Sequence, residues 1–215
     1  MKILILTDSL GLPRHKPEFC SFDDTWPVLL RKNGRNIHQV SIGAATSQVL
    51  LKQVTYQKAF NPNLVIIQVG IVDCAPRFMS NKELDFTGAL GACGRGLRFL
   101  FNRKWIKKLR NISYINEVDF KKNILKIQND FDCPILALGI LPASSEYENI
   151  LPGVTNKINL YNNILEQNFK YFLNTNETLD CNGIMNDHHH LNKIGHHYLF
   201  KKIDEFIQTK ELINV

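Results

Sequence analysis

Short apolar runs alternate with longer amphipathic stretches along most of this chain. The pattern predicts strands at about 2–7, 36–42, 63–69 and 134–140, with a short last strand near 178–182. The runs at 63–69 and 134–140 are apolar almost without interruption. Such runs are typical of strands that are buried on both faces, as in a parallel sheet covered by helices.

Helices are predicted between the strands, at about 24–33, 46–58, 117–130, 156–174 and 192–209. Asp24 and Thr25 can cap the first helix, and Pro27 suits its first turn. Strands that alternate with helices form βαβ units, which build a parallel sheet with helices on both faces. We therefore expect an α/β fold, a doubly wound three-layer α/β/α sandwich.

Composition places the chain among ordinary globular proteins. Its 215 residues, of which 44% are hydrophobic and 21% charged, can bury a substantial core, and we expect one domain over 1–215. The first apolar run is about five residues long, shorter than the ~7–15 residues of a secretory signal core. Because no apolar stretch approaches the ~20 residues of a membrane span, we expect a cytoplasmic protein without such a span.

The cysteines do not form a recognisable framework. They are an odd number, widely spaced and without a CxxC pair: Cys20, Cys74, Cys93, Cys133 and Cys181. This spacing argues against a set of disulfides and against a structural zinc site. We interpret the cysteines mostly as buried small hydrophobes in a reducing compartment, with Cys74 the best placed if one of them were catalytic. We expect no cofactor.

Polar and glycine-containing segments follow the predicted strands, where ligands and catalytic groups gather in a parallel α/β sheet. Asp8 and Ser9 follow the first strand, Gly43 follows the second, and the segment 70–77 follows the third. Near the far end of the chain, Asp187 stands three residues before His190, at the entrance to the last helix. A serine near one end and an Asp and a His near the other are the groups that a Ser-His-Asp hydrolase needs.

Each of these segments also has a simpler interpretation. The glycines can serve tight turns, Asp187 can cap the last helix, and three adjacent histidines can be a solvated turn or a metal site. Adjacent side chains cannot all converge on one ion without strain, so we expect no metal at His188, His189 and His190. The occurrence of all four segments at strand ends is what the simpler interpretations explain poorly.

At these positions the chain resembles the SGNH/GDSL hydrolases, small flavodoxin-like esterases and acyl-ester hydrolases. Thr7-Asp8-Ser9-Leu10 is similar to the Gly-Asp-Ser-Leu block with its first glycine replaced, and Gly43 stands at the glycine of the second block. Asp187-x-x-His190-Leu191-Asn192 closely matches the Asp-x-x-His-Leu-Asn block, the most specific of these motifs. The resemblance spans the domain and implies a three-layer α/β/α flavodoxin-like sandwich with a parallel sheet of about five strands.

The resemblance also implies roles for individual residues. Ser9 is expected to be the nucleophile and His190 the base that takes its proton. Asp187, or a carbonyl in its place, is expected to orient the imidazole. The amides of Ser9 and Gly43 would stabilise the oxyanion. His188 and His189 do not stand at the matching position.

The third block departs from the family's pattern. The family has Gly-x-Asn-Asp, whose asparagine donates to the oxyanion, and this chain has Val72 at that position. Losing one donor costs ~10²–10³ in rate, so either Arg77 or a loop amide completes the hole or the protein is slow on simple esters. Asp73 is expected to brace the loop, in a pair with Arg77 that is either a structural salt bridge or a substrate contact. Asp8 is a further candidate for a loop or substrate role.

The chain between the third strand and the next regular helix is long, and we treat about 78–116 as an insertion. Such segments are usually lids or carry helices, so we expect one or two short helices over the edge that holds the site. Seven basic residues and no acidic one lie from Arg95 to Arg110. This run is either a solvated helix face or the contact for an anionic ligand: a charged glycan, a phosphate-bearing substrate, a membrane surface or nucleic acid.

We expect a serine esterase or O-acyltransferase that passes an acyl group from an acyl-serine to water or to a sugar hydroxyl. Its substrate would be a small-molecule or glycan ester, with carbohydrate-linked esters the class that the resemblance favours. The alternative is a catalytically weakened protein of the same fold that binds an anionic glycan or polymer. Nucleic-acid binding rests on the basic run alone and is not expected, and a nucleotide-binding module would need a Gly-rich loop after the first strand.

Overall fold

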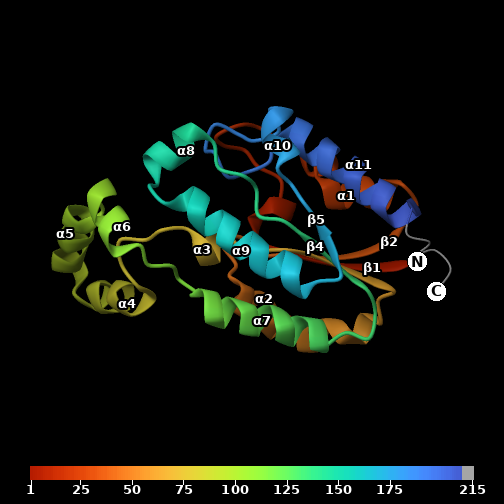
Figure 1. Ribbon diagram of the computed structural model, residues 1–215, viewed down its shortest axis with the longest axis horizontal. Helices are drawn as coiled ribbons and strands as arrows, with labels where there is room; N and C mark the ends of the chain where they lie inside the picture. Colours follow the sequence, from red (N-terminus) through yellow and green to blue (C-terminus); the bar gives the residue numbers. More distant parts are fainter. Residues whose placement is uncertain (210–215) are drawn as a thin grey trace.

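The computed structural model describes residues 1–209, and its centre is a sheet of five parallel strands in the order β2-β1-β3-β4-β5 (Figure 1). Their bounds are β1 Lys2–Thr7, β2 Asn36–Ser41, β3 Leu64–Gln68, β4 Ile135–Leu138 and β5 Tyr171–Leu173. The α/β class, the parallel sheet and its flavodoxin-like strand order are thereby confirmed.

Helices cover both faces of the sheet, which makes three layers (Figure 1). One face carries α1 (Trp26–Lys32) and α11 (Lys193–Thr209), and the other carries α2 (Ser47–Gln57), α7 (Glu117–Asn129) and α9 (Val154–Asn168). Alternate side chains of β1 divide between the two cores, Ile3 and Ile5 facing α1 and α11, and Leu4 and Leu6 facing the other helices. All four are fully buried, as the apolar run predicts.

The strand order creates a crevice beside β1. Thr7, the last residue of β1, pairs with Ser41 of β2 on one side and with Gln68 of β3 on the other. The crossover through α1 and the crossover through α2 therefore lie on opposite faces of the sheet. At such a switch point the carboxyl ends of the strands open the space where ligands bind in doubly wound folds, and the chain that leaves β1 enters this space.

The fifth strand differs from the prediction. α9 ends at Asn168 and β5 follows, whereas the sequence pattern extended the helix over 156–174 and placed the last strand near 178–182. The latter segment instead contains the short helix α10 (Glu177–Asp180). β5 lies at the edge of the sheet and its three residues are half-buried, so it lacks the fully buried run by which the inner strands are recognised.

The insertion holds three helices that stand away from the sheet (Figure 1): α4 (Asn81–Ala89), α5 (Gly91–Phe101) and α6 (Lys104–Arg110). We call residues 81–110 the helical lobe. α5 approaches α4 closely at Gly94, where a Cβ would lie 1.7 Å from the carbonyl oxygen of Thr87, and Arg98 donates to Thr87 Oγ1 at 2.8 Å. The expectation of one or two helices over the site is wrong, because α4 and α5 pack against each other instead.

Short helical turns complete the fold: η1 (Ser9–Gly11), η2 (Phe22–Asp24), η3 (Lys58–Phe60), α3 (Ile71–Cys74) and α8 (Ser145–Ile150). The five cysteines are all free thiols. The expectation that most of them are buried is wrong, because only Cys20 and Cys74 are buried, whereas Cys133 and Cys181 are half-buried and Cys93 on α5 is exposed. Within residues 1–209 no helix combines the length and the apolar character needed to cross a membrane.

Candidate active site

The turn that ends β1 holds Ser9 at the crevice. The Asp8 carboxylate accepts a hydrogen bond from the backbone amide of Leu10 at 2.9 Å and so caps η1, in which Ser9 is the first residue. Asp8 is fully buried, and its Oδ2 has no partner in the part of the chain that the structure describes. Burial raises the pKa of Asp8 to about 7. The Asp-Ser pair therefore supplies a cap and, directly after it, the hydroxyl of Ser9, a residue that is 9% exposed.

Ser9 and His190 lie in hydrogen-bond contact, although they are far apart in the sequence. Ser9 Oγ is 2.9 Å from His190 Nε2, and His190 Nδ1 is 2.8 Å from Asp187 Oδ2. The three side chains form one line from hydroxyl to imidazole to carboxylate. A nucleophile that faces a base, with a third group orienting that base, is the arrangement of a serine hydrolase triad.

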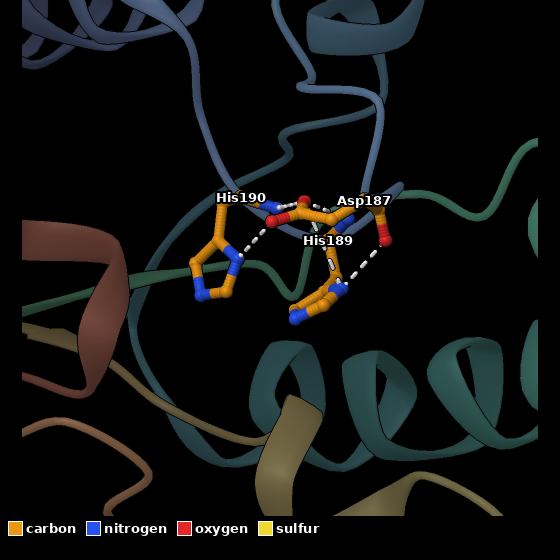
Figure 2. A group of neighbouring side chains, drawn as sticks. All are labelled: Asp187, His189 and His190. Carbon is orange, nitrogen blue, oxygen red and sulfur yellow. Dashed lines mark hydrogen bonds and ion pairs between the residues drawn. The ribbon is translucent and has the colours of Figure 1, made fainter. Parts of the chain in front are cut away.

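The turn before α11 aims Asp187 at His190. Asp187 Oδ1 accepts the backbone amides of His189 at 3.2 Å and of His190 at 3.1 Å, which leaves Oδ2 for the imidazole (Figure 2). α11 has a cap of its own, since Asn192 Oδ1 accepts the amide of Gly195 at 3.0 Å. The alternative that Asp187 caps the last helix is therefore wrong.

The other two histidines of the run have different partners. His188 has a positive φ of 66°, its ring faces Tyr147, and its Nδ1 is 3.4 Å from Ser144 Oγ. His189 Nδ1 donates to the backbone carbonyl of Asp187 at 2.7 Å (Figure 2). Of the three, His190 is the one whose ring meets Ser9.

Asp187, His189 and His190 also place atoms of the metal-ligand type within 4.8 Å of one another. In both rings, however, Nδ1 is bound to an oxygen of Asp187 (Figure 2). An ion held through these nitrogens would displace the hydrogen bond that orients His190. Metal binding through these nitrogens would therefore compete with the orientation of His190 toward Ser9.

The structure adds Arg14, which the sequence analysis did not single out. Arg14 Nη2 donates to His190 Nε2, the same nitrogen that faces Ser9. A guanidinium group offers no acceptor, so Nε2 is unprotonated and the ring proton lies on Nδ1, toward Asp187. This is the tautomer that a base acting on Ser9 requires. The local sequence around Arg14 carries no signal of this contact, because His190 lies 176 residues away.

Burial and the neighbouring positive charges favour the neutral form of the His190 imidazole. Burial lowers the pKa of His190, and the charges of His189 and Arg14 lower it further, against the opposing effect of Asp187. Burial raises the pKa of Asp187, but the hydrogen bond from His190 and the electrostatic effect of the two neighbouring imidazoles outweigh burial and hold that pKa below its ordinary range. A neutral base beside an ionised carboxylate is the state from which proton abstraction starts.

A pocket of about 980 Å³ opens beside Ser9. Ser9 and Gly43 line it, and the backbone amide of neither residue has an acceptor within residues 1–209. Both amides are therefore free to donate to an oxygen of a bound ligand. Val72 also lines the pocket. An apolar side chain therefore occupies the position at which the resemblance to the SGNH/GDSL hydrolases implies an asparagine that donates to the oxyanion.

Asp73 and Arg77 do not form the predicted pair. Asp73 is fully buried and accepts two hydrogen bonds from Ser47, from the amide at 2.9 Å and from the hydroxyl at 2.6 Å. Burial raises the pKa of Asp73 to about 6, although the hydrogen bonds from Ser47 oppose this. The interpretation of Asp73 as a brace stands, but its partner is the start of α2. The correction arises because α2 and α3 meet at this point, which local spacing does not encode.

Arg77 lines the pocket instead. Its guanidinium lies 4.4 Å from the ring centroid of Tyr114, and its backbone amide donates to the carbonyl of Ile112 at 2.8 Å. Its Nε is buried and has no partner among the described residues. Arg77, which precedes the insertion, and Tyr114 near its end thus reach the pocket, while the helices of the lobe do not.

Cys74 does not meet the requirements of a nucleophile. It is fully buried, its thiol donates to the carbonyl of Ile71 at 3.9 Å, and burial raises its pKa far above the ordinary range. A reactive cysteine needs an exposed thiolate of lowered pKa. The hypothesis of a catalytic Cys74 is therefore wrong.

Comparisons with protein-family models and with curated proteins find no match for this chain. Solved structures, in contrast, are similar to it over nearly its whole length. The psychrotrophic esterase EstA from Pseudoalteromonas sp. is 16% identical with a TM-score of 0.59, over 100% of this chain and 99% of its own. A GDSL-like lipase from Bacteroides thetaiotaomicron is 14% identical with a TM-score of 0.58, over 97% and 88%.

The acetyl xylan esterase AlAXEase is 16% identical with a TM-score of 0.58, over 96% of this chain and 100% of its own. At these identities the likeness is one of fold. The chain therefore has the fold of the SGNH/GDSL hydrolases.

Proposed function

We propose that this protein is a serine ester hydrolase or acyltransferase that acts through an acyl-serine at Ser9. The observation that carries the proposal is the hydrogen-bonded line from Ser9 through His190 to Asp187, beside an open pocket. That proteins of this fold are described as esterases and lipases supports the same reaction class. Ser9, His190 and Asp187 would be nucleophile, base and orienting group.

The geometry accounts for each step of acyl transfer. Ser9 Oγ attacks the acyl carbon while its proton passes to His190 Nε2, and the charge that develops on the carbonyl oxygen meets the amides of Ser9 and Gly43. The bond to the alcohol then breaks, and His190 gives the proton to the departing oxygen, which leaves the acyl group on Ser9. Water or a hydroxyl next gives a proton to His190 and takes the acyl group, and Ser9 recovers its proton.

For the substrate we propose a carbohydrate-linked ester. The pocket is open and combines polar side chains such as Thr46 and Gln48 with apolar ones such as Val49, which suits a sugar carrying a short acyl group. The similarity in fold to an acetyl xylan esterase supports this class. Product analysis with an acetyl donor, with and without a glycan acceptor, would separate hydrolysis from transfer.

Labelling with a fluorophosphonate probe tests the mechanism directly, and the esterase EstA of the same fold is inhibited by monoethylphosphonate. Ser9→Ala should abolish both labelling and turnover of short acyl esters. His190→Ala should be nearly as damaging, whereas His188→Ala, whose ring faces Tyr147, should be mild and serves as the matched control. If Ser9→Ala kept more than about a tenth of the activity, Ser9 would not be the nucleophile.

Val72 favours a second candidate function, a catalytically weakened protein that binds an anionic glycan or polymer. Without the third donor, turnover of simple esters would be slow, by ~10²–10³ for one missing donor. Absence of labelling at Ser9 in the folded protein, together with binding of an anionic glycan, would support this candidate over the esterase.

A further inference from the structure

Among residues 1–209, the pocket beside Ser9 is lined by two arginines and by no carboxylate. Arg14 belongs to the segment that follows η1, and Arg77 belongs to the loop that begins with α3. A ligand in this pocket therefore meets two fixed positive charges with no negative charge in the lining to balance them. Arginine is the residue that best recognises carboxylate and phosphate groups, because its planar donors match their oxygens in pairs.

Arg77 is held in place without an anionic partner. Its guanidinium rests on Tyr114, and no ion pair joins it to any carboxylate within residues 1–209. Asp73, its nearest acidic residue in sequence, is bound to Ser47. Arg77 therefore lines the pocket with a charge that no carboxylate among residues 1–209 pairs with, and its buried Nε also lacks a partner there.

Arg14 also lacks a carboxylate partner among the described residues. Its side-chain partner among the described residues is the neutral Nε2 of His190, and its own Nε is buried without one. The charges of Asp187 and Asp8 favour the charged form of Arg14 without a hydrogen bond to it. Asp8 accepts its hydrogen bond from the amide of Leu10, and Asp187 accepts from the ring of His190. While Arg14 donates to Nε2, it shares that nitrogen with the Ser9 hydroxyl.

We propose that the ester substrate carries an anionic group, a carboxylate or a phosphate, which Arg14 and Arg77 bind. This inference rests on the proposed function and names its substrate class. An anion in the pocket accepts the hydrogen bonds of Arg14, whose Nη2 then leaves His190. Nε2 is thereby free to accept the proton of Ser9 alone. Binding of the anionic group thus positions the substrate and releases the base.

The test compares O-acetyl esters of glucose, glucuronate and glucose 6-phosphate, which differ in the anionic group. We expect kcat/KM to be ~10–100-fold higher for at least one anionic ester than for the neutral one, the range of one charge-assisted hydrogen bond. Arg14→Gln and Arg77→Gln should each reduce this preference, whereas Arg31→Gln at the exposed end of α1 should retain it. The ester with the larger preference identifies the group as carboxylate or phosphate.

Equal kcat/KM for the three esters would overturn the inference. It would also be overturned if Arg14→Gln and Arg77→Gln each lowered kcat/KM by the same factor on the neutral and the anionic esters. Failure of the proposed function is distinguishable, because binding to Ser9→Ala is measured by calorimetry with the same three compounds. Tighter binding of an anionic ester than of the neutral one, lost in Ser9→Ala/Arg77→Gln, would support the anion site even without turnover. Equal binding of all three would contradict it.

A second inference rests on the surface of the helical lobe. Half of the large hydrophobic side chains that the structure leaves exposed lie within it: Phe86, Leu90, Leu97, Phe99, Leu100, Phe101, Trp105 and Leu109. On α5, Leu97, Leu100 and Phe101 share one face, and on α6, Trp105 (66% exposed) and Leu109 (77%) share another. An apolar surface of this extent marks an interaction site.

The lobe also holds the positive charge of the chain. Residues 81–110 contain eight lysines and arginines and two acidic residues, a net of +6 that equals the formal net charge of the whole chain. Arg98 and Arg110 are bound within the lobe and to its base. Arg95, Lys104 and Lys108 are exposed and have no carboxylate partner in the described residues.

We infer that the lobe docks on a bilayer surface that carries anionic headgroups. Aromatic and leucine side chains enter the headgroup boundary, and the lysines and arginines beside them meet the negative charge. A second copy of the chain is disfavoured, because it would bring two basic lobes together. Single-stranded nucleic acid could stack on Trp105 and Phe99, but binding of this kind does not account for the exposed leucines.

Sedimentation with vesicles tests the docking. The protein should sediment with vesicles of phosphatidylglycerol and phosphatidylcholine, less at high salt, and little with phosphatidylcholine alone. Trp105→Ala/Leu109→Ala and Lys104→Gln/Lys108→Gln should each lose at least half of the bound fraction, whereas Val118→Ala, exposed on α7, should not. Absence of binding, binding unchanged in both variants, a lobe-dependent dimer or preference for an oligonucleotide would each overturn the inference.

Discussion

Asp73 accepts hydrogen bonds from both the backbone amide and the hydroxyl of Ser47, so the carboxylate of the third block holds the first turn of α2. Asn123 on α7 completes the link by donating to Ser47 Oγ at 2.9 Å. The segment that holds the Gly43 amide leads directly into α2. Asp73 thereby positions a donor at the pocket without contacting the pocket itself.

Asp73→Ala should lower the free energy of unfolding by about 1–3 kcal/mol, the cost of leaving a buried donor unpaired. It should also lower kcat on an activated ester, because the Gly43 amide is no longer held in register with Ser9. Ser47→Ala keeps the backbone hydrogen bond and should be milder on both measures. Urea unfolding and ester kinetics check this, and unchanged stability in Asp73→Ala would contradict it.

The acid limb of activity should reflect the lowered pKa of His190. Its imidazole must be neutral to take the proton of Ser9, and burial with the charges of His189 and Arg14 lowers its pKa below 6.5. With a neutral activated ester, kcat/KM should rise with pH through a limb centred below 6.5. Arg14→Gln removes one charge, so its limb should move to higher pH, whereas that of Arg31→Gln should stay. A limb centred above 6.5 in the natural protein would contradict this assignment.

The raised pKa of Asp8 should make the free energy of unfolding fall as pH rises. Burial raises its pKa from 3.8 to about 7, so between these values the folded state holds a proton that the unfolded state has lost. The stability from this group is complete below the lower value and is lost as pH rises through the upper one. Asp8→Asn mimics the neutral acid and should gain on the natural protein, by up to about 1.4 kcal/mol per pH unit in that window. Urea unfolding across the window checks this, and a constant difference would contradict it.

Val72→Asn should not improve turnover of a neutral activated ester. Val72 is half-buried, packs against the core under α2 and α7, and forms a wall of the pocket, so an amide there loses apolar contact. Steady-state kinetics check this, with Val72→Ala as the control for lost volume. A rise in kcat of ~10-fold or more would show that the natural oxyanion hole lacks a donor. A fall in kcat with this ester in Arg77→Gln would instead assign Arg77 to that hole.

The architecture and the three residues of the candidate triad were predictable from the amino-acid sequence. Four strands were predictable because strands buried on both faces need uninterrupted apolar runs, and a parallel order follows once helices alternate with them. Ser9, Asp187 and His190 were predictable because each stands at a strand end or helix entrance within a recognisable motif. Their catalytic roles remain predictions that labelling and mutation will test.

The contacts between distant side chains could be known only from the folded chain. The edge strand β5, the partner of Asp73 and the contact of Arg14 with His190 all depend on segments far apart in the sequence. Periodicity records how deeply a residue is buried, but it carries no information about which distant group lies opposite. Burial is a property of one position and its neighbours along the chain, whereas a hydrogen bond across the fold is a property of two, and only the packed structure brings the two together.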